Sequence, residues 1–561
     1  MTNQSAKTGG ELLAEALAIH GTEIAFGVPG ESYLALLDAL VGGSIRFITC
    51  RQEGGAAMMA DAYGKLTGRP GVAMVTRGPG ATNAAAGVHI AFQDSTPMIL
   101  LVGQVARDMR DREAFQEVDY RQMYGALAKW VAEIDDARRI PEYLNRAFHT
   151  ATSGRPGPVV LALPEDMLSE RVAPPPAVDR YAPLEAAPTP AAMADLHRRL
   201  AAAERPLALL GGGGWDAESL ARVRAFAEAA DLPVAASFRC QDYLDNRSAC
   251  YVGHVGIGIN PALAARVKEA DLLLVVGARL GESTTAGYTL VEPPRPRQQL
   301  IHVYPQAEEL NRVYDADLGI VSDVKAFARA LGDLAPLDGS RWAAHRAAAR
   351  ADYEAHIEPL PVPGALQMAD IVRWLAETLP EDAILANGAG NYTTWVHRFF
   401  PYRGWRTQLA PTSGSMGYGA PAAVAAKAVH PDRPVIAFAG DGCFMMHGQE
   451  LATAAQYGLG ILVIVVDNGM YGTIRMHQER EYPTRVSGTD LRNPDFAALA
   501  AAYGAHSARV ERTEEFFPAF ETAMAEAEAG RPALLHLIID PEALTPVQSL
   551  SQIREKALGA A

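Results

Sequence analysis

The sequence is short of cysteine, of positive charge and of long apolar runs. Its 561 residues include four cysteines, whose spacing matches neither a disulfide framework nor a zinc site. Acidic residues outnumber basic ones by 65 to 50, and this balance argues against nucleic acid or an anionic membrane as a default partner. No apolar run approaches a membrane span, and the first residues lead into an amphipathic helix pattern without an apolar signal core. We therefore expect a soluble, cytoplasmic protein with buried thiols.

Length and linker composition predict several domains. A chain of 561 residues is long enough for three or four, each with its own core. Proline-rich stretches at residues 173–190 and 359–363 have the composition of linkers. Elsewhere, apolar strand patterns alternate with helical ones, which predicts parallel sheets covered on both faces. The predicted fold is α/β, with three doubly wound parallel-sheet domains at residues 1–172, 191–335 and 364–545.

The most informative stretch lies in the third domain. The apolar run Val435–Ala439 ends in Gly440-Asp441-Gly442, and the run Ile461–Val466 ends in Asp467-Asn468-Gly469. One βαβ crossover fits between them and places Asp441 and Asn468 at the carboxyl ends of neighbouring strands. Carboxylate and amide oxygens suit Mg²⁺, and glycines let backbone N–H groups approach a diphosphate. The stretch predicts a metal-bridged diphosphate site, with an ordinary strand-to-helix turn as the alternative.

This stretch resembles the thiamine diphosphate signature, and the whole chain resembles the acetohydroxyacid (acetolactate) synthase and pyruvate oxidase branch of that family. The resemblance implies thiamine diphosphate and Mg²⁺ as cofactors. It also implies that Gly440, Asp441, Gly442 and Asn468 bind the cofactor, and that Asp441, Asn468 and the carbonyl of Met470 are the metal ligands. Family members usually have Asn-Asn where this chain has Asp467-Asn468, so the ligand itself is kept.

The first domain holds the main catalytic candidate, Glu53, which follows a strand pattern and opens a helix. A carboxylate there could simply complement the helix dipole. However, the segment resembles the family's catalytic-glutamate block, which implies that Glu53 bonds N1′ of the aminopyrimidine. Such a bond favours the imino tautomer, whose nitrogen can take the proton from thiazolium C2. The turn at residues 78–83 could be held by an Asn83 cap, but in relatives this loop, here with Gly80 and Asn83, touches the pyrimidine ring.

Further candidates rest on the resemblance alone. Gln116 matches a glutamine that faces the reacting centre in acetohydroxyacid synthases, and Lys129 falls at their substrate-channel lysine. Met416 matches an apolar side chain that wedges between the two cofactor rings, although a methionine at such a turn is usually filler. His477 falls where these enzymes have an acceptor-selecting Trp, and we interpret it as a proton donor or as a surface histidine. The adjacent His-His pair of pyruvate decarboxylases is missing, which disfavours simple aldehyde release.

Two departures concern the middle domain. Ser283 stands where acetohydroxyacid synthases have an Arg that pairs with the carboxylate of the second oxoacid. Ile301-His-Val-Tyr304-Pro replaces a block whose carboxylates serve the adenosine part of a nucleotide. The glycine cluster Gly211–Gly214 after a strand pattern is only a weak nucleotide signal. The sequence therefore leaves FAD or ADP in the central domain open without favouring either.

The resemblance predicts a thiamine diphosphate-dependent lyase or transferase that decarboxylates a 2-oxoacid or related carbonyl substrate and then ligates the product, like acetolactate synthase. The alternatives are a simple 2-oxoacid decarboxylase, a carbon–carbon lyase and, from another class, a non-catalytic nucleotide- or cofactor-binding protein. Because Glu53 lies in the first domain and Asp441 in the third, the resemblance implies a cofactor held across a subunit interface. We expect a homodimer at minimum, and commonly a homotetramer.

Overall fold

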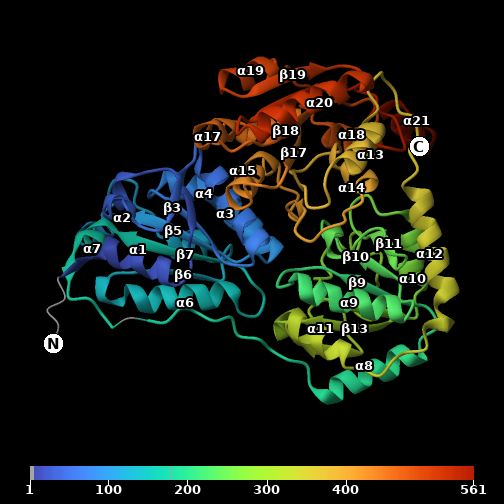
Figure 1. The fold of residues 1–561 in the computed structure, drawn as a ribbon, viewed down its shortest axis with the longest axis horizontal. Coiled ribbons are helices and arrows are strands. Elements are labelled where there is room, and N and C mark those ends of the chain that lie inside the picture. Colours follow the sequence, from blue (N-terminus) through green and yellow to red (C-terminus); the bar gives the residue numbers. More distant parts are fainter. Residues whose placement is uncertain (1–5, 177, 561) are drawn as a thin grey trace. The chain divides into compact units, whose positions relative to one another are not determined.

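The computed structural model describes residues 6–176 and 178–560, and its framework is three six-stranded parallel sheets (Figure 1). A short antiparallel pair, β1 (Lys7–Thr8) with β8 (Arg171–Val172), lies beside them. The predicted α/β fold with three parallel-sheet domains is confirmed. In the described part, none of the helices combines the length and the apolar character that crossing a bilayer requires.

The N-terminal sheet has the strand order β3-β2-β4-β5-β7-β6. Its strands are β2 (Ile24–Gly27), β3 (Arg46–Thr49), β4 (Gly71–Val75), β5 (Met98–Gln104), β6 (Trp130–Glu133) and β7 (Pro158–Pro164). Alternate strand residues share one core with α1 (Gly9–Ile19) and α6 (Ile140–Thr152). On the other side, α3 (Glu53–Thr67) and α4 (Pro79–Asp94) pack together, and both contact β4 and β5. Burial on both faces explains why the inner strands β4, β5 and β7 read as continuous apolar runs.

The other two sheets repeat this plan. The central sheet has the order β11-β10-β9-β12-β13-β14, and the C-terminal sheet has the order β16-β15-β17-β18-β20-β19. The central strands are β9 (Pro206–Leu210), β10 (Val234–Ala236), β11 (Tyr251–His254), β12 (Leu272–Val276), β13 (Gln299–Tyr304) and β14 (Leu318–Val321). The C-terminal strands are β15 (Ile384–Asn387), β16 (Gln408–Leu409), β17 (Val435–Gly440), β18 (Leu462–Asp467), β19 (His506–Val510) and β20 (Ala533–Ile538). In such sheets ligands bind at the carboxyl ends of the strands.

The chain forms two compact units that do not follow its linear order. The first unit contains the N-terminal domain through Leu184 together with residues 420–431 and 447–459. The second contains the central domain and the remainder of the C-terminal domain. Most of α15 (Gly419–Val429) and all of α17 (Glu450–Tyr457) therefore belong to the first unit, although both lie within the predicted third domain.

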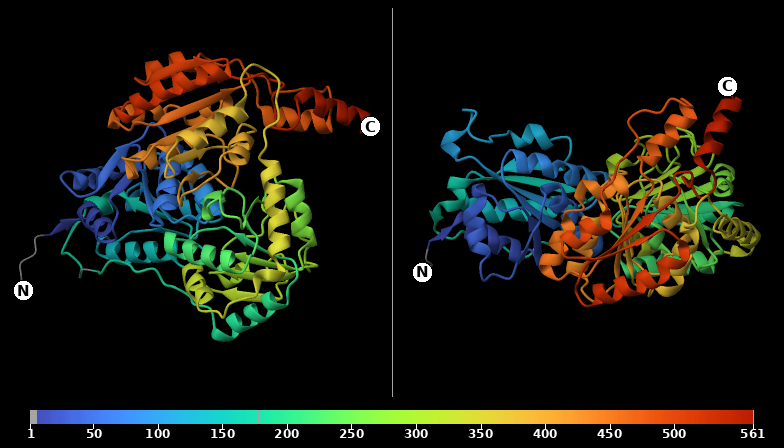
Figure 2. Two further views of the ribbon diagram at one scale, coloured as in Figure 1. Left: turned by 45° about the vertical axis from the view of Figure 1, so that its right-hand side comes forward. Right: turned by 90° about the horizontal axis from the view of Figure 1, so that it is seen from above.

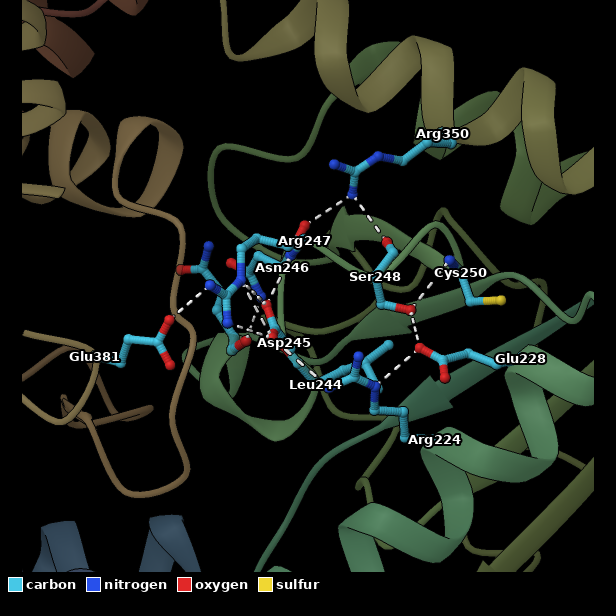
Figure 3. Close-up of polar contacts among 11 residues, drawn as sticks. Arg224, Glu228, Leu244, Asp245, Asn246, Arg247, Ser248, Cys250, Arg350 and Glu381 are labelled. Atoms are coloured by element: carbon cyan, nitrogen blue, oxygen red, sulfur yellow. Dashed lines mark hydrogen bonds and ion pairs between the residues drawn. The ribbon is translucent and has the colours of Figure 1, made fainter. Parts of the chain in front are cut away.

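Within the second unit, the loop at residues 244–250 joins the central and C-terminal domains (Figure 3). The Asn246 N–H donates to the carbonyl of Tyr402 at 2.9 Å, and its side-chain oxygen accepts the Tyr402 N–H at 3.0 Å. Arg247 reaches Glu381 at 2.6 Å, but both side chains are more than half exposed. Exposed ion pairs add little stability, so the buried bonds of Asn246 make the stronger connection. Figure 2 shows the ribbon of Figure 1 from two further directions.

Candidate functional site

The first group of predicted site residues lies at the carboxyl edge of the N-terminal sheet. Helix α3 begins at Glu53, and Gln52 caps it by accepting the Gly55 N–H at 3.0 Å. The Asn83 side-chain amide donates to Glu53 Oε2 at 2.9 Å. A Cβ at Gly80 would lie 3.2 Å from Glu53 Oε1, so a larger residue there would crowd this oxygen. The structure thus brings Glu53, Gly80 and Asn83 together, and their contact with a pyrimidine ring stays a prediction.

The turn before α4 places Gln116 at the same edge. Gly78 has φ +57°, and a Cβ there would lie 2.8 Å from Gln116 Cβ. A glycine is therefore required both for the left-handed backbone and for the close approach. The Gly78 N–H donates to the Tyr120 hydroxyl at 2.9 Å, which also anchors the turn. Phe115, next to Gln116, is 71% exposed, so it is not the packing plug that a loop phenylalanine usually is.

Lys129 lies elsewhere. Its Nζ donates to the carbonyls of Thr150 and Ser153, at 2.5 and 2.7 Å, where α6 ends. A cation at this point satisfies the last carbonyls of the helix and complements its dipole. Burial lowers the pKa of Lys129 to about 8. Lys129 therefore caps α6 in this structure, and a place in a substrate channel stays a prediction.

The second group lies at the carboxyl edge of the C-terminal sheet. Strands β17 and β18 are parallel neighbours, with Gly440 opposite Val466. Asp441 follows β17 directly, is buried and opens α16 (Asp441–His447). The Asn493 side-chain amide donates to Asp441 at 2.7 Å and to Asp467 at 2.8 Å, so one amide ties the two strand ends. No pattern in the sequence had singled out Asn493.

Asp467 occupies the position where the family usually has Asn, and its surroundings explain the change. His536 on β20 bonds Asp467 Oδ2 at 2.9 Å, and the Gly469 N–H donates to Oδ1 at 2.9 Å. Burial by itself raises the pKa of Asp467, but the hydrogen bonds from His536 and Gly469 lower it overall. A carboxylate therefore fits here better than an amide, because its partners are donors.

The residues at this edge fit a hydrated Mg²⁺ ion. Asn468 Oδ1 accepts the Met470 N–H at 3.2 Å, and the Met470 carbonyl accepts the Gly472 N–H at 2.9 Å, which leaves each oxygen a second lone pair. Burial, with Asp467 nearby, raises the pKa of Asp441 to about 6, and a bound cation would offset this cost. The described residues include no cluster of three or more His, Cys, Asp or Glu side chains suited to a metal. A site of one carboxylate, one amide and one carbonyl belongs to a different class, which is typical of Mg²⁺.

Gly440 and Gly442 are also favoured for steric reasons, because a Cβ at either position would crowd a tyrosine ring. A Cβ at Gly442 would lie 2.5 Å from the ring of Tyr471, and one at Gly440 would lie 3.1 Å from the ring of Tyr392. The two tyrosine rings therefore pack directly on the turn that begins α16. The diphosphate role of both glycines stays a prediction.

Met416 and Trp395 both pack against the C-terminal core. Met416 is partly buried, and the next residue, Gly417, donates its N–H to Cys443 Sγ at 3.1 Å, which holds the Met416 turn against α16. Trp395 is 1% exposed and belongs to the core itself. The partial exposure of Met416 is compatible with the predicted wedge.

His477 lies on the exposed side of α18 (Gly472–Glu481). Its Nδ1 contacts the guanidinium of Arg480, one turn further along the helix. Partial burial, together with the charge of Arg480, lowers the pKa of His477. This placement agrees with the surface interpretation, and a role in proton transfer stays a prediction.

The central sheet has a glycine-rich turn, but the chain itself fills it. Trp215 is 2% exposed, and its indole N–H donates to the Gly211 carbonyl at 2.9 Å; the Tyr243 hydroxyl donates to the Gly212 carbonyl. The N-terminus of α9 (Ala217–Ala229) is already capped by the Asp216 carboxylate, which accepts the Ser219 N–H at 2.8 Å. A carboxylate at a helix N-terminus opposes the binding of a diphosphate at the same place. The N-terminus of α9 is therefore not a suitable site for the diphosphate of FAD or ADP.

Family models match all three domains. The N-terminal TPP binding domain of thiamine pyrophosphate enzymes matches residues 7–123, their central domain matches residues 193–331, and their C-terminal TPP binding domain matches residues 388–537. Thiamine pyrophosphate (TPP) is another name for thiamine diphosphate. The first match contains the Glu53 group and the third contains the Asp441 group.

Individual relatives extend over almost the whole chain. Acetolactate synthase isozyme 2 large subunit from Escherichia coli K12 is 31% identical over 537 residues, which cover 95% of each chain. Acetolactate synthase large subunit from Corynebacterium glutamicum is 31% identical, covering 96% of this chain and 87% of the relative. A probable acetolactate synthase large subunit from Methanocaldococcus jannaschii is also 31% identical, covering 96% of this chain and 93% of the relative. By its three domains and by this similarity along its length, the chain belongs to the thiamine pyrophosphate enzyme family.

Proposed function

We propose that the protein is a thiamine diphosphate- and Mg²⁺-dependent carboligase that decarboxylates a 2-oxoacid and joins the remaining fragment to a second carbonyl compound. When bound, the cofactor supplies a thiazolium ring that accepts the electrons released as CO₂ leaves. The protein residues position the reactants and move protons. The relatives named as acetolactate synthases support this reaction class.

The observation that carries the proposal is the surroundings of Glu53. Its carboxylate stands in the first turn of α3, half-buried, with one oxygen held by Asn83 and the other facing Gly80. A carboxylate fixed in this way can accept a hydrogen bond from a protonated ring nitrogen and stabilise it. Asn83 is thereby a positioning residue, because it selects the direction in which Glu53 presents its second oxygen.

In the second unit, Asp441, Asn468 and the Met470 carbonyl would hold Mg²⁺, and the first turn of α16 would face the diphosphate. Burial of Asp441 and the Asn493 bridge fix the carboxylate before the ion binds. Prearranged ligands reduce the ordering cost of binding. Met416 would support the two rings of the cofactor. The proposed function includes no nucleotide in the central domain.

A second candidate is the same chemistry with an acceptor that lacks a carboxylate, or the reverse cleavage as a carbon–carbon lyase. One observation favours it: Ser283 stands at the position where acetohydroxyacid synthases pair an Arg with the second oxoacid. A serine can donate a hydrogen bond but cannot neutralise an anion. An aldehyde or ketone acceptor would not need that charge.

Product analysis separates these functions. We would incubate the protein with thiamine diphosphate, Mg²⁺ and a panel of 2-oxoacids, alone and with added aldehydes, and identify products by mass spectrometry. The proposal expects CO₂ together with a ligated product whose mass equals the two carbonyl compounds minus CO₂. EDTA should abolish turnover, and the purified protein should lack flavin absorbance.

Other outcomes assign other functions. CO₂ with free aldehyde and no ligated product would indicate a simple decarboxylase. Cleavage of a hydroxyketone without CO₂ would indicate the lyase. If titration with thiamine diphosphate and Mg²⁺ produced no circular dichroism signal of the bound cofactor and no turnover, the enzyme proposal would be wrong.

A further inference from the structure

Helix α17 contacts the segment that leads into Glu53, although the two lie far apart in sequence. Both belong to the first compact unit. Glu450, the first residue of α17, is fully buried, and its Oε1 accepts the backbone N–H groups of Arg51 and Gln52 at 3.1 and 3.0 Å. Its Oε2 accepts the Thr453 hydroxyl at 2.6 Å. The Glu450 carboxylate thus bonds the two backbone N–H groups immediately before Glu53, the first residue of α3.

Neighbouring contacts fix the same segment. The Tyr457 hydroxyl accepts the Thr49 N–H at 2.8 Å at the end of β3. His447 Nε2 lies 3.2 Å from Gln52 Oε1, the oxygen that caps α3. Two residues of α17, together with the last residue of α16, therefore hold three of the four residues that precede Glu53.

Gly55 shows that this approach is close. A Cβ at Gly55 would lie 2.7 Å from Glu450 Oε1, closer than real Cβ contacts allow. Gly55 has helical backbone and no positive φ, so its conformation alone does not require glycine. The reason for a glycine two residues after Glu53 is therefore the space that Glu450 occupies.

We propose that Glu450 is a positioning residue for Glu53: its buried carboxylate clamps the backbone at the N-terminus of α3 and so fixes where the Glu53 side chain stands. This inference rests on the proposed function, in which Glu53 bonds the pyrimidine ring of the cofactor. Glu450 itself touches neither substrate nor cofactor in this role. A displacement of the catalytic group by about 1 Å can slow catalysis by about a hundredfold.

The test uses Glu450→Ala, Glu450→Gln and a control on the same helix, Gln456→Ala. Gln456 accepts a hydrogen bond from the side chain of exposed Arg51 at 2.5 Å and does not bond the backbone N–H groups that Glu450 holds, so its removal leaves both of them bonded. The alanine variant should lower kcat by between about tenfold and a hundredfold, with KM for the 2-oxoacid within about threefold. The glutamine variant keeps an acceptor oxygen and should restore most of this loss.

Two readouts besides turnover distinguish positioning from general stability. Proton–deuterium exchange at C2 of the bound cofactor, followed by NMR, should slow in Glu450→Ala in proportion to kcat and remain normal in Gln456→Ala. In the cofactor-free protein, amide hydrogen exchange of residues 50–55 should accelerate in Glu450→Ala only. The proposal would be overturned if Glu450→Ala exchanged the C2 proton at the wild-type rate. It would also be overturned if the alanine and glutamine variants lost kcat equally.

Gly55→Ala keeps the proposal testable if Glu450→Ala does not fold. The added methyl group should displace the Glu450 carboxylate and slow C2 exchange, although Glu450 itself is retained. Normal C2 exchange in Gly55→Ala would contradict the clamp. If the wild-type protein bound the cofactor without any C2 exchange, the proposed function would be wrong. Amide hydrogen exchange of the cofactor-free protein would still show whether Glu450 fixes the backbone before α3.

Discussion

At the scale of single residues, Glu53 and Asp441 differ in the kind of support that they receive. Glu53 is half-buried and is oriented by one amide, Asn83, and by the backbone of α3. Asp441 is buried, and Asn493 joins it to Asp467. Burial raises the pKa of Asp441, so Asp441 gains from a bound cation. This difference suits a proton-handling residue in one case and a metal ligand in the other.

Glu53→Gln tests the first role. The glutamine amide keeps the shape of the side chain and can still bond Asn83. It carries no negative charge, so it cannot stabilise a protonated ring nitrogen as the carboxylate does. We expect thiamine diphosphate affinity within about threefold and turnover lower by roughly a hundredfold to ten-thousandfold. Calorimetric titration of the cofactor and steady-state kinetics measure the two quantities. Turnover near the wild-type rate would remove Glu53 from catalysis.

At the scale of elements, the C-terminal helix α21 (Leu550–Ala560) is bound to α18 through one buried carboxylate. Glu479 is 1% exposed and accepts hydrogen bonds from Arg554 on α21, at 2.7 and 2.8 Å, and from Arg475 at 3.0 Å. The hydrogen bonds from Arg554 above all lower the pKa of Glu479 to about 2. Since α18 follows the Met470 turn, this ion cluster supports the element next to the predicted metal ligands.

The pH dependence of this cluster has a definite sign. A carboxylate whose pKa falls on folding stabilises the folded state above its unfolded pKa, and this stabilisation disappears as the pH falls toward its folded pKa. Glu479→Gln should therefore lower the free energy of unfolding by about 3 kcal/mol at pH 7 and at pH 5.5. The loss should become progressively smaller between about pH 4.5 and pH 2.5. Urea unfolding at each pH measures the difference. The matched control is Glu481→Gln on the same helix, whose side chain is 62% exposed and should change stability by less than about 0.5 kcal/mol. A pH-independent loss in Glu479→Gln would contradict the assignment.

At the scale of the whole molecule, Glu53 and Asp441 belong to different compact units of one chain. The family resemblance predicts that each cofactor takes Glu53 from one subunit and Asp441 from another. Two inactive variants would then repair each other when mixed. This prediction concerns assembly and needs a test in solution.

The test mixes Glu53→Gln with Asp441→Ala after mild dissociation and reassociation. A mixed dimer would have one site with both residues intact and one site with neither. If the subunits pair at random, activity should return to about a quarter of the wild-type value. Each variant treated alone should stay inactive. No recovery, with mixed dimers confirmed by native mass spectrometry, would place both residues of a site in one chain.

Much of the architecture could be read from local patterns. The apolar runs Val435–Ala439 and Ile461–Val466 became the buried strands β17 and β18, and the helix that Glu53 was expected to open became α3. The edge strand β6 was not predicted, because its four residues are mostly half-buried and have no continuous apolar run. Edge strands have only one neighbour to bury them, so their sequence signal is weak.

The sequence by itself determined the three parallel sheets and the positions of Glu53, Asp441 and Asn468 at strand ends, because apolar runs and glycine turns act over a few residues. Only the tertiary structure decided which distant groups meet: Asn493 joins the ends of β17 and β18, Glu450 bonds the backbone before α3, and Lys129 caps the end of α6. These contacts join residues that are well separated in the chain. Their partners are chosen by packing and by the need to satisfy buried polar groups, and no local pattern encodes that choice.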